Sequence, residues 1–178
     1  MRCITVSILA LAVCAAKGAD DLKPGLIGEY FDMGGAVEDF PKVDDKKPAV
    51  RRLDREINWD GTGDNFAGTE LADHFYVRWT GVLRVEKAGP YTLYTESDDG
   101  SRLWIDGKQV VDNGGLHGME ERSGKVELTA GDHEIKIDLF ENEGEVGMKV
   151  SWQADGGEKK IIPAGAYFHK ADEKLDKN

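Results

Sequence analysis

Apolar and polar side chains alternate along most of the chain between Leu26 and Phe168. The alternation is clearest in residues 75–80, and it returns in residues 134–139 and 146–152. A period of two is typical of strands with one buried face, and no long stretch shows the 3.6-residue spacing of helices. The pattern predicts an all-β chain. Its expected buried positions are Phe75, Val77, Trp79, Ile135, Ile137, Leu139, Val146, Met148, Val150 and Trp152, with Tyr76, Arg78 and Thr80 on a face expected to meet water.

Short runs of turn residues separate these segments. Asp106-Gly107 is the strongest hairpin signal, because both central positions of a type I′ turn need positive φ and this pair tolerates it. Gly89-Pro90 and residues 130–132 mark further turns, and the SDDG sequence of residues 97–100 interrupts an alternating segment. Two packed antiparallel sheets satisfy this many half-buried strands, so we expect a two-sheet antiparallel β-sandwich.

Two parts of the chain lack the regular alternation. Residues 33–68 are rich in Asp, Gly, Lys and Pro, and we expect them to cross the surface with short strands such as residues 57–59. Residues 170–178 form an almost wholly charged C-terminal tail, which we expect to fray. A chain of 178 residues has room for one domain.

The first 18 residues have the layout of a secretory signal peptide. Arg2 precedes the apolar run Cys3–Ala16, and small residues follow up to Gly18. That run is too short to span a bilayer, so we expect no transmembrane segment and a chain that is secreted, periplasmic or held in the cell envelope. A lipid anchor at Cys14 is the alternative to simple cleavage. Both cysteines lie in this leader, so the exported part contains no disulfide.

The net charge of the chain is −11 at pH 7. Such an acidic protein repels nucleic acid and anionic lipid, which excludes nucleic-acid-binding functions, whereas neutral sugars and divalent cations are not repelled. The sequence also contains no nucleophile elbow, phosphate-binding loop or dinucleotide fingerprint. We therefore expect a binding protein rather than an enzyme.

Several segments together point to one domain family. They are GLIGEYFD near the start, the RWTG and GPYTL strands, the SDDGSRLWIDG hairpin, the LTAGDHEI turn and the closing VSW. In these segments the chain resembles the PA-14 domain, a β-sandwich module of toxins, glycosidases, proteases and adhesins. The resemblance covers residues 25–169. It implies a β-sandwich fold above all. As a second expectation, it implies sugar binding through calcium, as in the yeast flocculins and epithelial adhesins.

The resemblance implies a calcium site in this chain. Adhesin members hold the ion with two adjacent aspartates joined by a cis peptide bond, with an asparagine of a neighbouring loop and with backbone carbonyls. Asp98 and Asp99 match the aspartate pair, and Asn142 matches the asparagine. The carbonyls of Gly144 and Val146 would then complete the protein ligands. The aromatic residue that often shapes sugar specificity in the adhesins has no counterpart here.

Calcium takes about six to eight oxygen ligands, so this set leaves about two positions open. Vicinal sugar hydroxyls can fill them while donating hydrogen bonds to the carboxylates, so Asp98, Asp99 and Asn142 are also the expected sugar contacts. The alternative is an ordinary turn at residues 98–100, because Asp and Gly favour turns. The matching alternative function is a structural or protein-interaction module of the cell envelope without a sugar ligand.

Other candidate sites are weaker. The acidic loop of residues 59–65 lacks the spacing of an EF-hand, and we interpret it as a turn-rich loop. The four histidines, His74, His117, His133 and His169, lack metal-ligand spacing, so we interpret them as surface residues. All tryptophans except Trp59 lie in alternating segments and are expected in the core rather than stacked on sugars.

Overall fold

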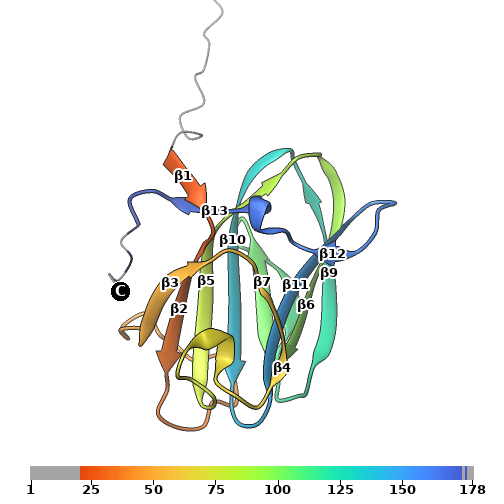
Figure 1. Ribbon diagram of the computed structural model, residues 1–178. Helices are drawn as coiled ribbons and strands as arrows, with labels where there is room; N and C mark the ends of the chain where they lie inside the picture. The colour runs from red at the N-terminus through yellow and green to blue at the C-terminus, as the bar shows by residue number, and fades with distance from the viewer. Residues whose placement is uncertain (1–20, 174, 176–178) are drawn as a thin grey trace, which may run out of the picture.

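The computed structural model describes residues 21–173 and residue 175, which form two antiparallel sheets packed face to face (Figure 1). This confirms the predicted two-sheet β-sandwich. The expected signal peptide of residues 1–18 and the alternative lipid site at Cys14 lie outside the described residues. Within the described part of the chain, no helix is long and apolar enough to cross a membrane.

The first sheet, sheet A, has eight strands. They are β1 (Leu22–Pro24), β2 (Leu26–Asp32), β3 (Val50–Asp54), β5 (Phe75–Val85), β7 (Ser101–Ile105), β8 (Lys108–Asn113), β10 (Gly131–Glu141) and β13 (Tyr167–Lys170). The main path of paired strands is β1, β13, β5, β10, β7 and β8, while β2 pairs with both β5 and β3. The long strands β5 and β10 pair along their whole length, from Gly131 opposite Val85 to Glu141 opposite Phe75.

The second sheet, sheet B, has five strands. They are β4 (Asn58–Thr62), β6 (Gly89–Asp98), β9 (Glu120–Leu128), β11 (Val146–Ala154) and β12 (Lys160–Ile161). Strand β11 pairs with β6, and β4 and β12 both pair with β11. Two short 3₁₀ turns, η2 (Phe66–Gly68) and η3 (Ala164–Ala166), lie in the connections. The short strand expected at residues 57–59 overlaps β4.

The core lies between the sheets and follows the predicted alternation. Trp79 is fully buried there, and Trp59 stacks on it with ring centres 5.9 Å apart. Trp152 packs at the edge of the same core. Burial of a large apolar side chain stabilises the fold by roughly 1.5–3 kcal/mol. The predicted positions Phe75, Val77, Ile135, Ile137, Leu139, Val146, Met148 and Val150 all belong to this core.

The outer face of sheet A carries a second apolar cluster, where the alternation predicted contact with water. Phe31, Tyr76 and Phe140 are cross-strand neighbours on β2, β5 and β10. Val37 and Val43, from the irregular segment after β2, pack over them. Tyr76 is consequently buried, and the prediction for it was wrong because a loop covers a face that alternation alone assigns to solvent.

Trp104 also lies on the outer face of sheet A, so its assignment to the core was wrong. Leu103 and Ile105 on either side of it are buried between the sheets, which turns the indole outward. Nζ of Lys136, on the neighbouring strand β10, lies 3.6 Å from the centre of the indole ring. This arrangement places an aromatic residue at an accessible surface.

The β7–β8 hairpin has the predicted turn. Asp106 has a φ of 50° and Gly107 a φ of 76°, the positive values that a type I′ turn requires. The Asp106 carboxylate also accepts the backbone N–H of Glu134 (2.9 Å) and lies 2.7 Å from Nδ1 of His133. The turn is therefore tied to the start of β10.

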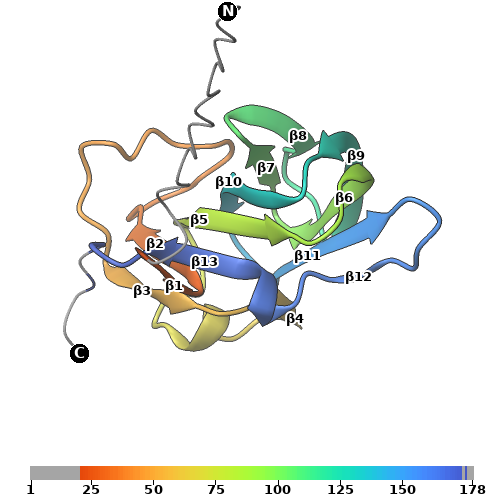
Figure 2. The ribbon, with the colours of Figure 1, turned by 90° about the horizontal axis from the view of Figure 1, so that it is seen from above.

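The two ends of the described chain lie together, away from the end of the sandwich where β6 and β10 finish (Figures 1 and 2). Strand β1 pairs with β13, and the backbone N–H of Ala171 donates to the carbonyl of Asp21 (2.7 Å). Glu173 accepts a hydrogen bond from Arg51 of β3 (2.8 Å). The first residues of the charged tail are thus held against sheet A.

Candidate cation site

Three segments meet at the lower end of the sandwich in Figure 1: the turn between β6 and β7, the end of β10 with its following loop, and the loop between β8 and β9. Strands β6 and β10 belong to different sheets, so their ends bring residues of both sheets together. Gly100 lies so close to the ring of Phe140 that a Cβ at this position would overlap it. The turn is therefore packed directly against the end of β10.

Asp98 and Asp99 form the centre of this region. They are joined by a cis peptide bond, and their exposed fractions are 8% and 6%. The Asp99 carboxylate accepts the backbone N–H of His117 through Oδ1 (2.8 Å) and that of Asn142 through Oδ2 (3.0 Å). Two loops therefore fix the position of the Asp99 side chain.

Glu141 is a third carboxylate that the sequence interpretation missed. Its Oε2 accepts the backbone N–H of Asp99 (3.0 Å), whereas its Oε1 is buried without a hydrogen-bond partner among the described residues. One oxygen each of Asp98, Asp99 and Glu141 lie within 4.8 Å of one another. We call these three residues the acid cluster.

The electrostatics of the acid cluster favour a bound cation. Burial and the neighbouring charges of Asp99 and Asp98 raise the pKa of Glu141 to about 8. Burial and the charge of Asp99 likewise raise the pKa of Asp98 to about 6. Both shifts mean that negative charge on these groups is unfavourable without compensation. A cation placed among them would remove that penalty.

The remaining predicted ligands lie around the acid cluster. Oδ1 of Asn142 accepts the backbone N–H of Val37 (3.0 Å), so this amide oxygen holds the segment that covers sheet A. Gly144 lies in the loop after β10, and Val146 begins β11, whose next residue pairs with Asp98. The assignment of Asn142, Gly144 and Val146 as metal ligands stays a prediction.

A buried polar network supports the turn from inside. Oγ of Ser97 and Oγ of Ser101, on either side of the turn, lie 2.7 Å apart. Nδ2 of Asn113 donates to Ser97 Oγ (3.1 Å) and to the carbonyl of Glu120 (2.9 Å). These contacts tie the turn to the ends of β8 and β9, so the acid cluster rests on ordered strands.

The weaker candidates do not join this site as ligands. The ring nitrogens of His117 lie 2.9 Å from the carbonyl of Gly118 and 3.2 Å from that of Asn113, so the ring is engaged by its own loop. His133 and His169 are buried, so the interpretation as surface residues was wrong for these two.

Asp60 belongs to the acidic segment of residues 59–65, which was interpreted as a loop; residues 59–62 instead lie in strand β4, so that interpretation was wrong for them. The Asp60 side chain pairs with Lys149 (2.7 Å). Its side chain is thereby directed to a lysine rather than to another carboxylate.

Comparison with known families places the sandwich and its acid cluster in context. The model of the PA14 domain matches residues 22–166. The chain belongs to the PA14 domain family. The resemblance seen in the sequence motifs is thereby confirmed, and the acid cluster lies within the matched residues.

Two curated relatives share part of this PA14 domain. The anti-sigma-I factor RsgI3 of Acetivibrio thermocellus is 31% identical over 147 residues, which are 81% of this chain and 21% of that protein. The protective antigen of Bacillus anthracis is 30% identical over 88 residues, which are 47% of this chain and 11% of that protein. The chain therefore spans only a small part of the length of these relatives.

Solved structures share the fold. The PA14 sugar-binding domain from an RTX adhesin superposes with a TM-score of 0.71 at 22% identity, covering 82% of this chain and 98% of that chain. The epithelial adhesin 9 A domain from Candida glabrata, in complex with Galβ1-3GlcNAc, gives a TM-score of 0.67 at 11% identity and covers 88% and 94%. At these identities the likeness shows the architecture alone.

Proposed function

We propose that this PA14 domain is a secreted, non-catalytic module that binds carbohydrate through a calcium ion at the acid cluster. The observation that carries the proposal is the convergence of three buried carboxylates at a loop-lined end of the sandwich, one of them with an oxygen that has no partner among the described residues. Two structures with the same fold are described as sugar-binding or as a glycan complex, which supports the ligand class.

The donor set fits a hard cation. It consists of oxygen atoms only, and calcium prefers carboxylate, amide and carbonyl oxygens. Oε1 of Glu141 is buried and has no hydrogen-bond partner in the part of the chain that the structure describes, so it is an acceptor that needs such a partner. When bound, the ion would offset the repulsion among the acids and attract two neighbouring hydroxyls. The expected ligands are Asp98, Asp99, Glu141, Asn142 and the carbonyl oxygens of Gly144 and Val146.

The three carboxylates have different parts in this proposal. Asp98 and Asp99 retain a small exposed surface, so they can accept hydrogen bonds from sugar hydroxyls, and Asn142 is the third expected sugar contact. Glu141 is fully buried and cannot touch a sugar, so it serves the cation and the backbone of Asp99. Acids gathered at one point do not flank a glycosidic bond from two sides, which favours binding over hydrolysis.

The first test compares melting in calcium and in chelator. Calcium at about 100 times its Kd should stabilise the protein by about 2.7 kcal/mol, a rise in Tm of roughly 5–10 °C. Asp99→Asn should abolish this rise. Asp60→Asn, which changes an exposed acid of strand β4, should retain it. Equal Tm values of the wild type with calcium and with chelator would refute the cation site.

The second test identifies the ligand class. We expect at least one glycan on an array whose binding disappears both in chelator and in Asp99→Asn. Calcium-dependent melting without any such glycan would instead favour the alternative function, a structural or protein-interaction module of the cell envelope. Binding that survives chelator and Asp99→Asn for every bound glycan would place the sugar elsewhere on the domain.

A further inference from the structure

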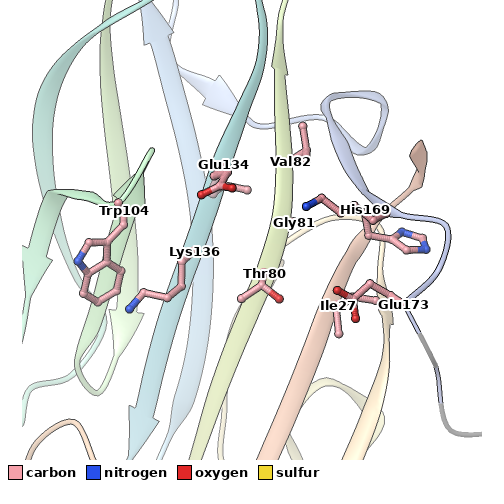
Figure 3. Close-up of a pocket in the computed structure, with 12 residues that line it drawn as sticks. Ile27, Thr80, Gly81, Val82, Trp104, Glu134, Lys136, His169 and Glu173 are labelled. Atoms are coloured by element: carbon pink, nitrogen blue, oxygen red, sulfur yellow. The ribbon is translucent and has the colours of Figure 1, made fainter. Parts of the chain in front are cut away.

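A trough crosses the outer face of sheet A, away from the acid cluster (Figure 3). Its volume is about 410 Å³, which lies in the range of small-ligand sites. Trp104 stands at the β7 side, and Glu173 lies at the opposite side near β2. Strands β10 and β5 form the floor between them. The trough therefore runs across the strands rather than along them.

Cross-strand register explains the shape of the trough. Trp104 lies opposite Lys136, Lys136 lies opposite Thr80, and Thr80 lies opposite Ile27. This row spans three strand spacings of about 4.8 Å, or roughly 14 Å in total. In a second row, Glu134 lies opposite Val82. Small and medium side chains at the centre of the rows leave the hollow that Figure 3 shows between Trp104 and the C-terminal segment.

Several polar groups of the trough are available for a ligand. Glu134 and Lys170 are exposed and Thr80 is partly exposed, and their side chains form no hydrogen bond or ion pair within the described part of the chain. Lys136 contacts the indole of Trp104 and lies 3.7 Å from Asp138. The trough thus combines an aromatic surface with free donors and acceptors, which suits an amphipathic ligand.

We propose that this trough binds a neutral, unbranched oligosaccharide independently of calcium. Sugar rings have an apolar face that packs on an indole and hydroxyls that hydrogen-bond to carboxylate, ammonium and hydroxyl groups. The trough carries two lysines, Lys136 and Lys170, and two glutamates, Glu134 and Glu173, so its charge is balanced. The net charge of −11 repels polyanions. A length of about 14 Å exceeds one sugar ring, which favours an oligosaccharide.

The Lys136 side chain can change position when a ligand enters the trough. Its flexible four-carbon stem lets the ammonium leave the indole and donate to a sugar hydroxyl while the ring receives the sugar. The buried neighbours Leu103 and Ile105 fix the strand at Trp104, so its side chain faces outward before binding. The ligand therefore meets an outward-facing aromatic residue beside a movable donor.

The test measures binding of cellohexaose, xylohexaose and mannohexaose by isothermal titration calorimetry in the presence of chelator. We expect the wild type to bind at least one of them, and Trp104→Ala to weaken that binding by about tenfold or more. Asp99→Asn should leave it unchanged, which separates the trough from the proposed calcium site. Trp104→Phe should restore part of the affinity.

The matched control is Tyr94→Ala. Tyr94 is also a partly exposed aromatic residue, on sheet B, with Nζ of Lys159 4.9 Å from its ring centre. It lies outside the trough, so its loss should leave binding unchanged. The proposal is overturned if the wild type binds none of the three hexasaccharides in chelator. It is also overturned if Tyr94→Ala weakens binding as much as Trp104→Ala, with unaltered circular dichroism for both variants.

Discussion

Replacement of Glu141 by glutamine should stabilise the protein in the absence of calcium and reduce the stabilisation that calcium gives. Glutamine keeps the size of the side chain and an oxygen that can accept the backbone N–H of Asp99. It removes a carboxylate that burial and two neighbouring aspartates make costly to ionise. Without calcium, the variant should therefore be more stable than the wild type at neutral pH.

The magnitude follows from the pKa of Glu141, which is raised from 4.5 to about 8. In the unfolded chain the group loses its proton near pH 4.5, whereas the folded protein keeps it up to about pH 8. Stability is therefore full below pH 4.5 and falls as the pH rises towards 8. At pH 7 the loss is at most about 3 kcal/mol. Because the three acids share the repulsion, we expect Glu141→Gln to recover about 1–3 kcal/mol, or about 2–4 °C in Tm for each kcal/mol.

The assay is thermal unfolding from pH 4.5 to pH 8, with chelator and with calcium. In chelator, Glu141→Gln should melt above the wild type at pH 7 and equally at pH 4.5. In calcium, the wild type should gain more stability than the variant. Glu143→Gln, at a neighbouring side chain that is 70% exposed, serves as the control and should change neither result. A Tm difference that does not vary with pH would refute the reasoning.

Two further predictions concern the framework. Gly124→Ala should lower the free energy of unfolding by about 1–3 kcal/mol, because the new Cβ would overlap the carbonyl oxygen of Val110 where β9 meets β8. Denaturant titration measures this change. An unchanged midpoint would contradict the close approach of the two strands. Asp106→Asn keeps the turn but removes the carboxylate that, against the effect of burial, raises the pKa of His133. The pKa of His133, measured by NMR, should fall, and stability should decrease only at pH values low enough to protonate His133; equal loss at pH 8 would contradict the ion pair.

Much of the sandwich could be predicted because its strands have one buried face. The alternation in residues 75–80 and 146–152 identified core positions correctly, since side-chain direction in a strand depends only on parity. The Asp106-Gly107 turn was equally predictable, because few residue pairs tolerate two positive φ values in succession. Both predictions, of the core positions and of the turn, depend only on residues that are close in the sequence.

The outer face of sheet A could not be predicted in this way. Tyr76 and Phe140 occupy outward positions, and only strand register places them next to each other and to Phe31. The segment that covers them is irregular and gives no periodic signal. Trp104 was misplaced for a simpler reason, because the buried positions Leu103 and Ile105 already assigned it to the outer face by parity.

The third acid of the cluster had a signal in the sequence. Residues 135, 137 and 139 point into the core, and Glu141 continues the same parity at the end of the strand. A carboxylate at an inward position needs a charged or hydrogen-bonding partner, so it marks a polar site. Its proximity to Asp98 and Asp99 depends on how the two sheets stack, which the sequence did not indicate.

The pairing of β1 with β13 determines how the domain responds to mechanical tension. The strands are antiparallel, and Asp21 and Ala171 are joined at the ends from which the chain continues in both directions. A force applied to both ends would act on this pair in the unzipping geometry, so its hydrogen bonds would break one after another and not all at once. The strands would peel apart at low force, while β6 and β10, with the acid cluster at their far ends, remained folded. A ligand at the proposed site would therefore stay bound while the two ends of the domain moved apart.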